Sequence, residues 1–240
     1  MKYFQFAAIA VVMATPVFSQ DGEYDKILAL LVDEQYEKVL YKCEPYTLKD
    51  DTKNEPIPYL YMAMAYFEIS KRGEYAEKYP KAFKESLKYA TKHRKKDKDN
   101  EYYKEFADFF SELRQQTISE AETLNDQGKY TSSKSYYQNL VNIDLDDPGA
   151  VIMLGYVFAK LKSKKDATDN FNKAKEMLES KGTEGLADEQ VRLLKNAIMK
   201  LATMYMDEGN SAEARAWIEL GNRFFEEDKE YQTVYRDIAG

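Results

Sequence analysis

The sequence predicts an all-α protein, an array of antiparallel helical hairpins, and two observations indicate this fold. In the stretch 148–179, small and apolar residues recur at helical spacing on both sides of a polar turn at 162–166. The same pattern returns about 34 residues upstream, and two copies in register indicate a repeat protein. The matched residues are Ala121, Ser133 and Tyr137 upstream, and Gly155, Ala167 and Phe171 downstream.

The matched hairpins combine small residues, which let two helices approach closely, with aromatic residues that fill the remaining space. Gly128, Lys129 and Tyr130 add a Gly-x-Tyr turn. This combination resembles the tetratricopeptide repeat (TPR) family. The resemblance implies a right-handed superhelical solenoid that acts in protein–protein interaction. The residues expected to pack the repeats are Ala63, Tyr66, Ala121, Gly128, Tyr130, Gly155, Phe158, Ala167, Phe171, Ala174, Ala202, Gly209 and Ala214.

We expect about five hairpins, of which the central two are the most regular. In the first hairpin, Pro45 is expected to end or kink the second helix. In the second, the insertion 71–80 enlarges the turn, and the third opens with one long helix over 101–127. Trp217, Phe224 and Phe225 could seal the end of the stack. The expected hairpins span about 21–48, 56–98, 101–147, 148–181 and 186–230.

Residues 1–19 have the pattern of a secretory signal peptide. Lys2 is followed by an apolar run at 4–14, and the small residues Val17 and Ser19 offer a cleavage site before Gln20. The run is shorter than the roughly 20 residues that a membrane span requires; an N-terminal anchor or a buried helix is the alternative. We therefore expect one exported repeat domain over 20–240, periplasmic or secreted. A glutamine after the cleavage site resembles exported proteins of Bacteroidota.

The composition disfavours several classes of function. The net charge of −7 argues against nonspecific nucleic-acid binding, and no second long apolar segment predicts an integral membrane span in the mature chain. Cys43 is the only cysteine, so it cannot form an internal disulfide and is expected to be buried. We find no phosphate loop, nucleophile elbow or Cys/His metal cluster. His93 has no evident carboxylate partner, and helix capping explains the aspartates at 144–147. We expect no metal, no cofactor and no catalysis.

A basic run lies at the end of the second hairpin. The segment 71–98 holds 11 Lys or Arg against four Asp or Glu, whereas 207–237 holds four against nine. The run is either a solvated helix end or a contact for phosphate, anionic lipid or an acidic partner. The opposite charges also leave head-to-tail self-association open, so the oligomeric state is not determined. The basic residues singled out are Lys92, Arg94, Lys95, Lys96 and Lys98.

The TPR resemblance implies that the first helices of successive hairpins line a concave groove that binds a peptide. The preferred function is a non-catalytic adaptor or scaffold of the bacterial cell envelope. The alternatives are a structural subunit of an envelope or secretion assembly, held through its edges and caps, and a glycan-binding envelope protein. Insertions or neighbouring hairpins could also cover the groove. The candidate groove residues are Leu60, Met64, Phe67, Ile118, Glu122, Asn125, Ile152, Tyr156, Met199, Thr203 and Met206.

Overall fold

All regular structure is helical in the computed structural model, which describes residues 22–240. In the first half, the helices are α1 (Tyr24–Val32), α2 (Tyr36–Leu48), α3 (Pro56–Ser70), α4 (Ala82–Lys96), α5 (Glu101–Glu105) and α6 (Ala107–Asp126), with a 3₁₀ turn, η1 (Gly73–Tyr75), before α4. In the second half, they are α7 (Tyr130–Ile143), α8 (Pro148–Lys160), α9 (Lys164–Ser180), α10 (Asp188–Asp207), α11 (Ser211–Phe225) and α12 (Lys229–Ala239). The expected signal peptide, 1–19, lies outside the described residues.

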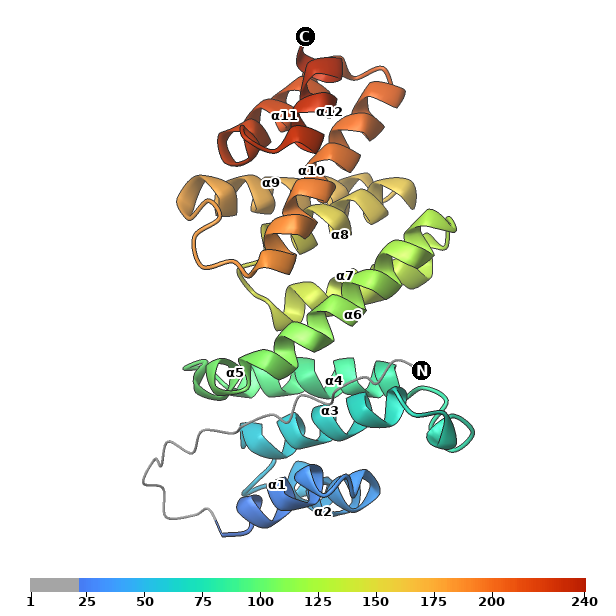
Figure 1. The fold of residues 1–240 in the computed structure, drawn as a ribbon, viewed down its shortest axis with the longest axis vertical. Coiled ribbons are helices and arrows are strands. Elements are labelled where there is room, and N and C mark those ends of the chain that lie inside the picture. Colours follow the sequence, from blue (N-terminus) through green and yellow to red (C-terminus); the bar gives the residue numbers. More distant parts are fainter. Residues whose placement is uncertain (1–21) are drawn as a thin grey trace, which may run out of the picture.

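Ten of these helices pair into five hairpins, which are α1/α2, α3/α4, α6/α7, α8/α9 and α10/α11. The hairpins stack into an elongated array with α1 and α2 at one end and the C-terminus at the other (Figure 1). Each hairpin alone leaves an apolar face uncovered, and stacking on the next hairpin buries it. The all-α class and the solenoid of helical hairpins, both predicted from the sequence, are confirmed.

Small residues lie where the two helices of a hairpin approach each other. A side chain added at Gly155 in α8 would meet the ring of Phe171 in α9 at 2.6 Å. In the two preceding hairpins a serine hydroxyl on the second helix hydrogen-bonds a carbonyl on the first. Ser133 Oγ donates to the Ala121 oxygen at 3.0 Å, and Ser86 Oγ donates to the Ala63 oxygen at 2.8 Å. The hairpins therefore share one packing scheme even where their sequences diverge.

The other residues expected to pack the repeats are turn glycines, half-buried aromatic residues or buried core residues. Gly128 and Gly209 have φ values of +70° and +75°, a left-handed conformation that favours glycine at a turn. Tyr66, Tyr130 and Phe158 are half-buried. The side chains that are buried in the core are Ala63, Ala121, Ala167, Phe171, Ala174, Ala202 and Ala214.

Three helix boundaries differ from the sequence-based expectation. The long helix expected over 101–127 is interrupted at Phe106, which separates the short helix α5 from α6. Asp97 fixes the start of α5 by accepting hydrogen bonds from the backbone N–H groups of Glu101 and Tyr103. Helix α2 continues through Pro45 to Leu48. A last helix, α12, follows the fifth hairpin and was not expected; Asp228 caps its first turn by accepting from the N–H of Tyr231.

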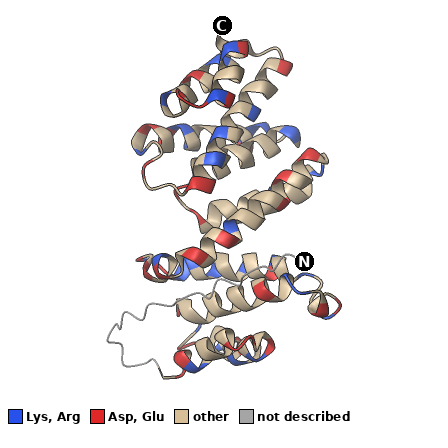
Figure 2. Ribbon diagram, in the orientation of Figure 1, with Lys and Arg blue, Asp and Glu red and all other residues tan. Residues whose placement is uncertain are grey.

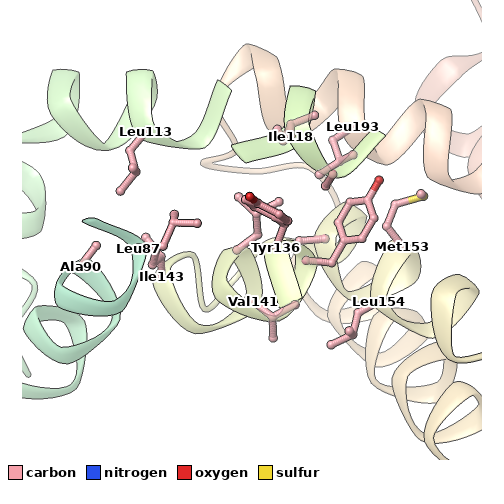
Figure 3. Packing of buried hydrophobic residues seen from close by; sticks show 14 of the residues in the cluster. Leu87, Ala90, Leu113, Ile118, Tyr136, Val141, Ile143, Met153, Leu154 and Leu193 are labelled. Carbon is pink, nitrogen blue, oxygen red and sulfur yellow. The ribbon is translucent and has the colours of Figure 1, made fainter. Parts of the chain in front are cut away.

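The core runs through the whole stack, and the first helices of the last three hairpins meet in it. Figure 3 shows side chains of this core, among them Ile118 of α6, Met153 of α8, Leu193 of α10 and Tyr136 of α7. All four side chains are buried. Ten consecutive residues of α8, 148–157, are buried, so this helix is enclosed on every side.

Candidate functional site

Most of the groove expected from the sequence is part of the core. The burial of these side chains corrects the expectation that they face an open groove, because they contact neighbouring helices instead of solvent. The six buried candidates are Leu60, Phe67, Ile118, Asn125, Ile152 and Tyr156. The expectation failed because helical spacing tells which residues share a face but not how closely successive first helices approach.

Helices α6 and α10 close this face through polar side chains. Lys200 Nζ lies 2.8 Å from Asp126 Oδ1. Farther along the same two helices, Ser111 Oγ donates to Glu189 Oε1 at 2.9 Å. Glu122 of α6 also faces α10 and accepts a hydrogen bond from the Asn196 side chain. Burial raises the pKa of Glu122, and the positive charges of neighbouring side chains on α10 partly offset this rise. The contacts between α6 and α10 thus replace the open groove that was expected here.

A row on α10 stays accessible. Met199 is half-buried, whereas Thr203 and Met206 are exposed. These residues are four and three positions apart, so they lie on one face of the helix. The other accessible candidates, Met64 of α3 and Glu122 of α6, are half-buried. We call Met199, Thr203 and Met206 the α10 row.

A buried ion network joins α5, α6, α7 and α10, and sequence reasoning missed it. Arg114 Nε and Nη2 donate to the two carboxylate oxygens of Asp144 at 2.7 and 3.1 Å. Arg114 also contacts Glu189, and the Tyr103 hydroxyl donates to Asp144. Burial by itself lowers the pKa of Arg114, but the Asp144 carboxylate raises it more, so the guanidinium stays charged. The charged and polar groups of the network bind one another, and in this way they hold the helices together.

His93 and Arg94 are structural as well. Arg94 was expected in a basic patch, but it is buried, donates from Nε to the Ile143 oxygen at 2.8 Å and lies over the Tyr103 ring. His93, expected to lack a carboxylate partner, has Asp97 Oδ2 3.6 Å from its Nε2. Burial lowers the pKa of His93, so the ring is neutral at pH 7. The spacing of His93 and Asp97, i and i+4, was a readable signal for this contact.

The remaining basic residues lie at the surface of α4 and just after it. Lys92, Lys95 and Lys98 are exposed, and Lys96 is half-buried, with its ammonium 4.8 Å from the centre of the Tyr59 ring. Burial, reinforced by the charges of Lys92 and Lys53, lowers the pKa of Lys96. The predicted basic patch therefore loses Arg94 and keeps its lysines.

Three features bear on whether residues 22–240 form a metal or ligand site. Residues 22–240 contain no group of three or more His, Cys, Asp or Glu that could hold a metal ion. Cys43 is buried, and burial raises the pKa of its thiol to about 12. A cavity of about 60 Å³ beside Pro148 and Met177 is far smaller than the several hundred Å³ of a typical ligand site.

Among residues 22–240, no helix is both long enough and apolar enough to cross a membrane.

The aspartates that the sequence suggested as caps divide into two roles. Asp147 caps α8 by accepting from the N–H of Ala150 at 3.0 Å, as expected, whereas Asp144 belongs to the ion network.

Comparisons with known proteins add little to this description. No protein-family model matches the chain. No curated protein is significantly similar to it in sequence. A solved structure, the TPR2AB-domain:pHSP90 complex of yeast Sti1, matches over 92% of this chain and 98% of its own, with 14% sequence identity and a TM-score of 0.36. At this similarity, the fold assignment rests on the hairpins of the chain itself.

Proposed function

We propose that this chain is a non-catalytic helical-repeat scaffold that holds a protein or peptide partner, and that the α10 row is its contact. The observation that carries the proposal is the accessibility of the α10 row on a first helix, beside the part of the groove that is closed. Met199 and Met206 are adaptable apolar side chains, which suit a surface that must fit a partner. The proposed location is the bacterial cell envelope, after export.

The surroundings of the α10 row fit a peptide or helix with apolar anchors. The ring of Tyr156 is approached by the ammonium groups of Lys160 and Lys200, at 5.2 and 5.8 Å from its centre. A partner that places apolar side chains on the methionines can thus reach cations at one border. Helix-in-groove recognition uses anchors three or four residues apart, which matches the spacing of the α10 row.

The test is a crosslinked pull-down of the tagged mature protein from its native cell envelope, read by mass spectrometry and repeated with purified partner. The variant Thr203→Arg/Met206→Glu changes two accessible side chains and should abolish capture of a stoichiometric partner while the circular dichroism melt is kept. Leu145→Glu, at an exposed apolar residue before α8, is the matched control and should leave capture unchanged. Capture that survives the α10 variant would exclude this contact.

A structural subunit is the second candidate, and the first hairpin favours it. Val32, Tyr41 and Leu48 expose 73%, 76% and 73% of their surface, and no further helix covers the outer side of α1 and α2 in the described chain. By contrast, α12 covers the other end of the array. A partner lost on Tyr41→Lys/Leu48→Lys but retained in the α10 variant would favour an assembly held through this end.

A further inference from the structure

One exposed face of α4 carries a row of lysines. Five lysines follow one another at intervals of three or four residues, which places them on one side of the helix. At 1.5 Å per residue the row is about 21 Å long. Figure 2 shows Lys and Arg gathered along α4. The α4 lysine row consists of Lys81, Lys84, Lys88, Lys92 and Lys95, all of which are exposed.

Most of these lysines form no ion pair within the described chain. Only Lys88 forms an ion pair, with Glu85 on its own helix. Other cations of the same hairpin and its turn are paired: Lys71 with Glu68 and Glu112, Arg72 with Glu34, and Lys78 with Glu37. Like charges three or four residues apart destabilise a helix. The α4 lysine row is therefore not explained by the stability of the hairpin.

A ladder of tyrosine rings supports the row. Its centroids are 6.2 Å apart between Tyr75 and Tyr79, 6.2 Å between Tyr79 and Tyr66, 5.6 Å between Tyr66 and Tyr89, and 6.5 Å between Tyr89 and Tyr59. The ammonium groups of Lys88 and Lys92 lie 5.3 and 5.1 Å from the centre of the Tyr89 ring. These cation–π contacts hold the two charges close to a rigid surface.

The tyrosine stacking and the lack of exposed apolar residues on α4 favour a protein as the ligand of the α4 lysine row, over a nucleic acid or a membrane. Tyr66 and Tyr89 stack on each other at 11°, so their faces are used within the protein and are not free for bases. The exposed large apolar side chains of residues 22–240 are Val32, Tyr41, Leu48, Leu145 and Met206. None lies on α4, whereas a helix that binds a membrane surface needs apolar side chains to insert.

We propose that the α4 lysine row docks an acidic protein segment whose carboxylates lie along one face at intervals of three or four residues. The spacing of about 4.5–6 Å between successive lysines along the axis equals that of Glu residues placed at i, i+3 and i+4 on a facing helix. This surface is separate from the α10 row, so it adds a second contact and does not depend on the first.

The experiment measures binding of two fluorescent 15-residue helical peptides to the purified protein by anisotropy at low and moderate salt. The striped peptide has five Glu on one face; its isomer has the same composition with Glu distributed around the helix. The variant Lys84→Glu/Lys95→Glu reverses two unpaired charges of the row. The matched control, Lys164→Glu/Lys173→Glu, reverses two exposed lysines of α9, the second helix of another hairpin.

We expect the striped peptide to bind better than its isomer and more weakly as salt rises. The row variant should lose roughly five- to tenfold in affinity, and the control and the α10 variant should lose none. If the row variant folds poorly, Lys84→Gln/Lys95→Gln takes its place. A dimer of the wild type in sedimentation that is absent in the row variant would also support the proposal. A second copy of the chain would then supply the acidic segment.

Three results would overturn the proposal. Equal binding of both peptides would show that net charge, not the row, is recognised. Equal weakening by the row and control variants would place the binding elsewhere. Binding of polyphosphate, a single-stranded oligonucleotide or phosphatidylserine vesicles, with no binding of the striped peptide, would assign the row to another class of ligand.

Discussion

The guanidinium of Arg114 and the carboxylate of Asp144 form a two-pronged, buried ion pair that joins the two helices of the third hairpin. The atoms Nε and Oδ2 are 2.7 Å apart, and Nη2 and Oδ1 are 3.1 Å apart. Both side chains are buried. A buried charge that loses its partner cannot recover its hydration. Removing one partner should therefore destabilise the fold by more than the intact pair contributes to stability.

Arg114→Met should therefore lower the free energy of unfolding by about 3–5 kcal/mol. The double variant Arg114→Met/Asp144→Leu should cost less than the sum of the two single variants, with a coupling energy of about 0.5–3 kcal/mol. Urea denaturation followed by circular dichroism measures both quantities. Lys165→Ala, which removes an exposed pair with Asp169, should leave stability almost unchanged. Additive effects of the two single variants would contradict the coupling.

Gly149 lies where the backbones of α8 and α10 approach each other closely. A side chain at this position would lie 2.6 Å from the Leu194 backbone nitrogen. Backbone cannot move aside as a flexible side chain can, so Gly149→Ala should cost about 1–3 kcal/mol. Gly73→Ala is the control, because nothing lies within 4 Å of the added carbon, and its effect should be within about 1 kcal/mol. Equal melting temperatures for the two variants would mean that α8 and α10 are farther apart.

Asp147 predicts a pH dependence of stability. Burial, reinforced by the negative charge of Asp144, raises the pKa of Asp147 from 3.8 to about 7. The folded state thus binds this proton more tightly than the unfolded state does, so the contribution of Asp147 to stability falls as pH rises from about 4 to about 7. Over that window the unfolding free energy of the wild type should fall relative to that of Asp147→Asn, by at most about 1.4 kcal/mol per pH unit.

Urea titrations of both proteins at four or five pH values between 4 and 8 measure this difference. Burial also lowers the pKa of His93 in the folded state. This makes the free energy of unfolding rise with pH, up to the pKa that His93 has in the unfolded chain. Both proteins contain His93, so its effect cancels in the comparison. Parallel stability curves for the wild type and Asp147→Asn would rule out a titration of Asp147 in this range.

The sequence predicted the hairpins because each one is a local pattern. Gly155 and Phe171 are 16 positions apart, and both helical spacing and the alternation of small and large residues connect them. The contacts that close the face between α6 and α10 have no such signature. Asp126 and Lys200 are 74 positions apart, and Arg114 and Glu189 are 75 apart. Their meeting depends on how the hairpins stack, so Ile118 and Tyr156 could be read as groove residues although they are buried.

Helix α12, by contrast, had a local signature that the sequence-based prediction overlooked. Tyr231, Val234, Tyr235 and Ile238 recur at helical spacing on one face, and Asp228 just before them is a typical N-cap residue. The residue that anchors this helix is Tyr231. In the folded chain it is fully buried, and its hydroxyl donates to the Ile218 oxygen of α11 at 2.7 Å.

Tyr231 should accordingly control whether α12 stays docked on the fifth hairpin. Tyr231→Ala removes a buried ring and should cost about 3–5 kcal/mol, whereas Tyr231→Phe removes one hydrogen bond and should cost about 0.5–1.5 kcal/mol. Tyr235→Ala, at a half-buried position of the same helix, should cost less than Tyr231→Ala. Hydrogen exchange should show the amides of α12 losing protection first in Tyr231→Ala, because Tyr231 is the only fully buried side chain of this helix. Retained protection there would mean that Val234 and Ile238 suffice to dock α12, and that the C-terminal end of the array does not depend on this ring.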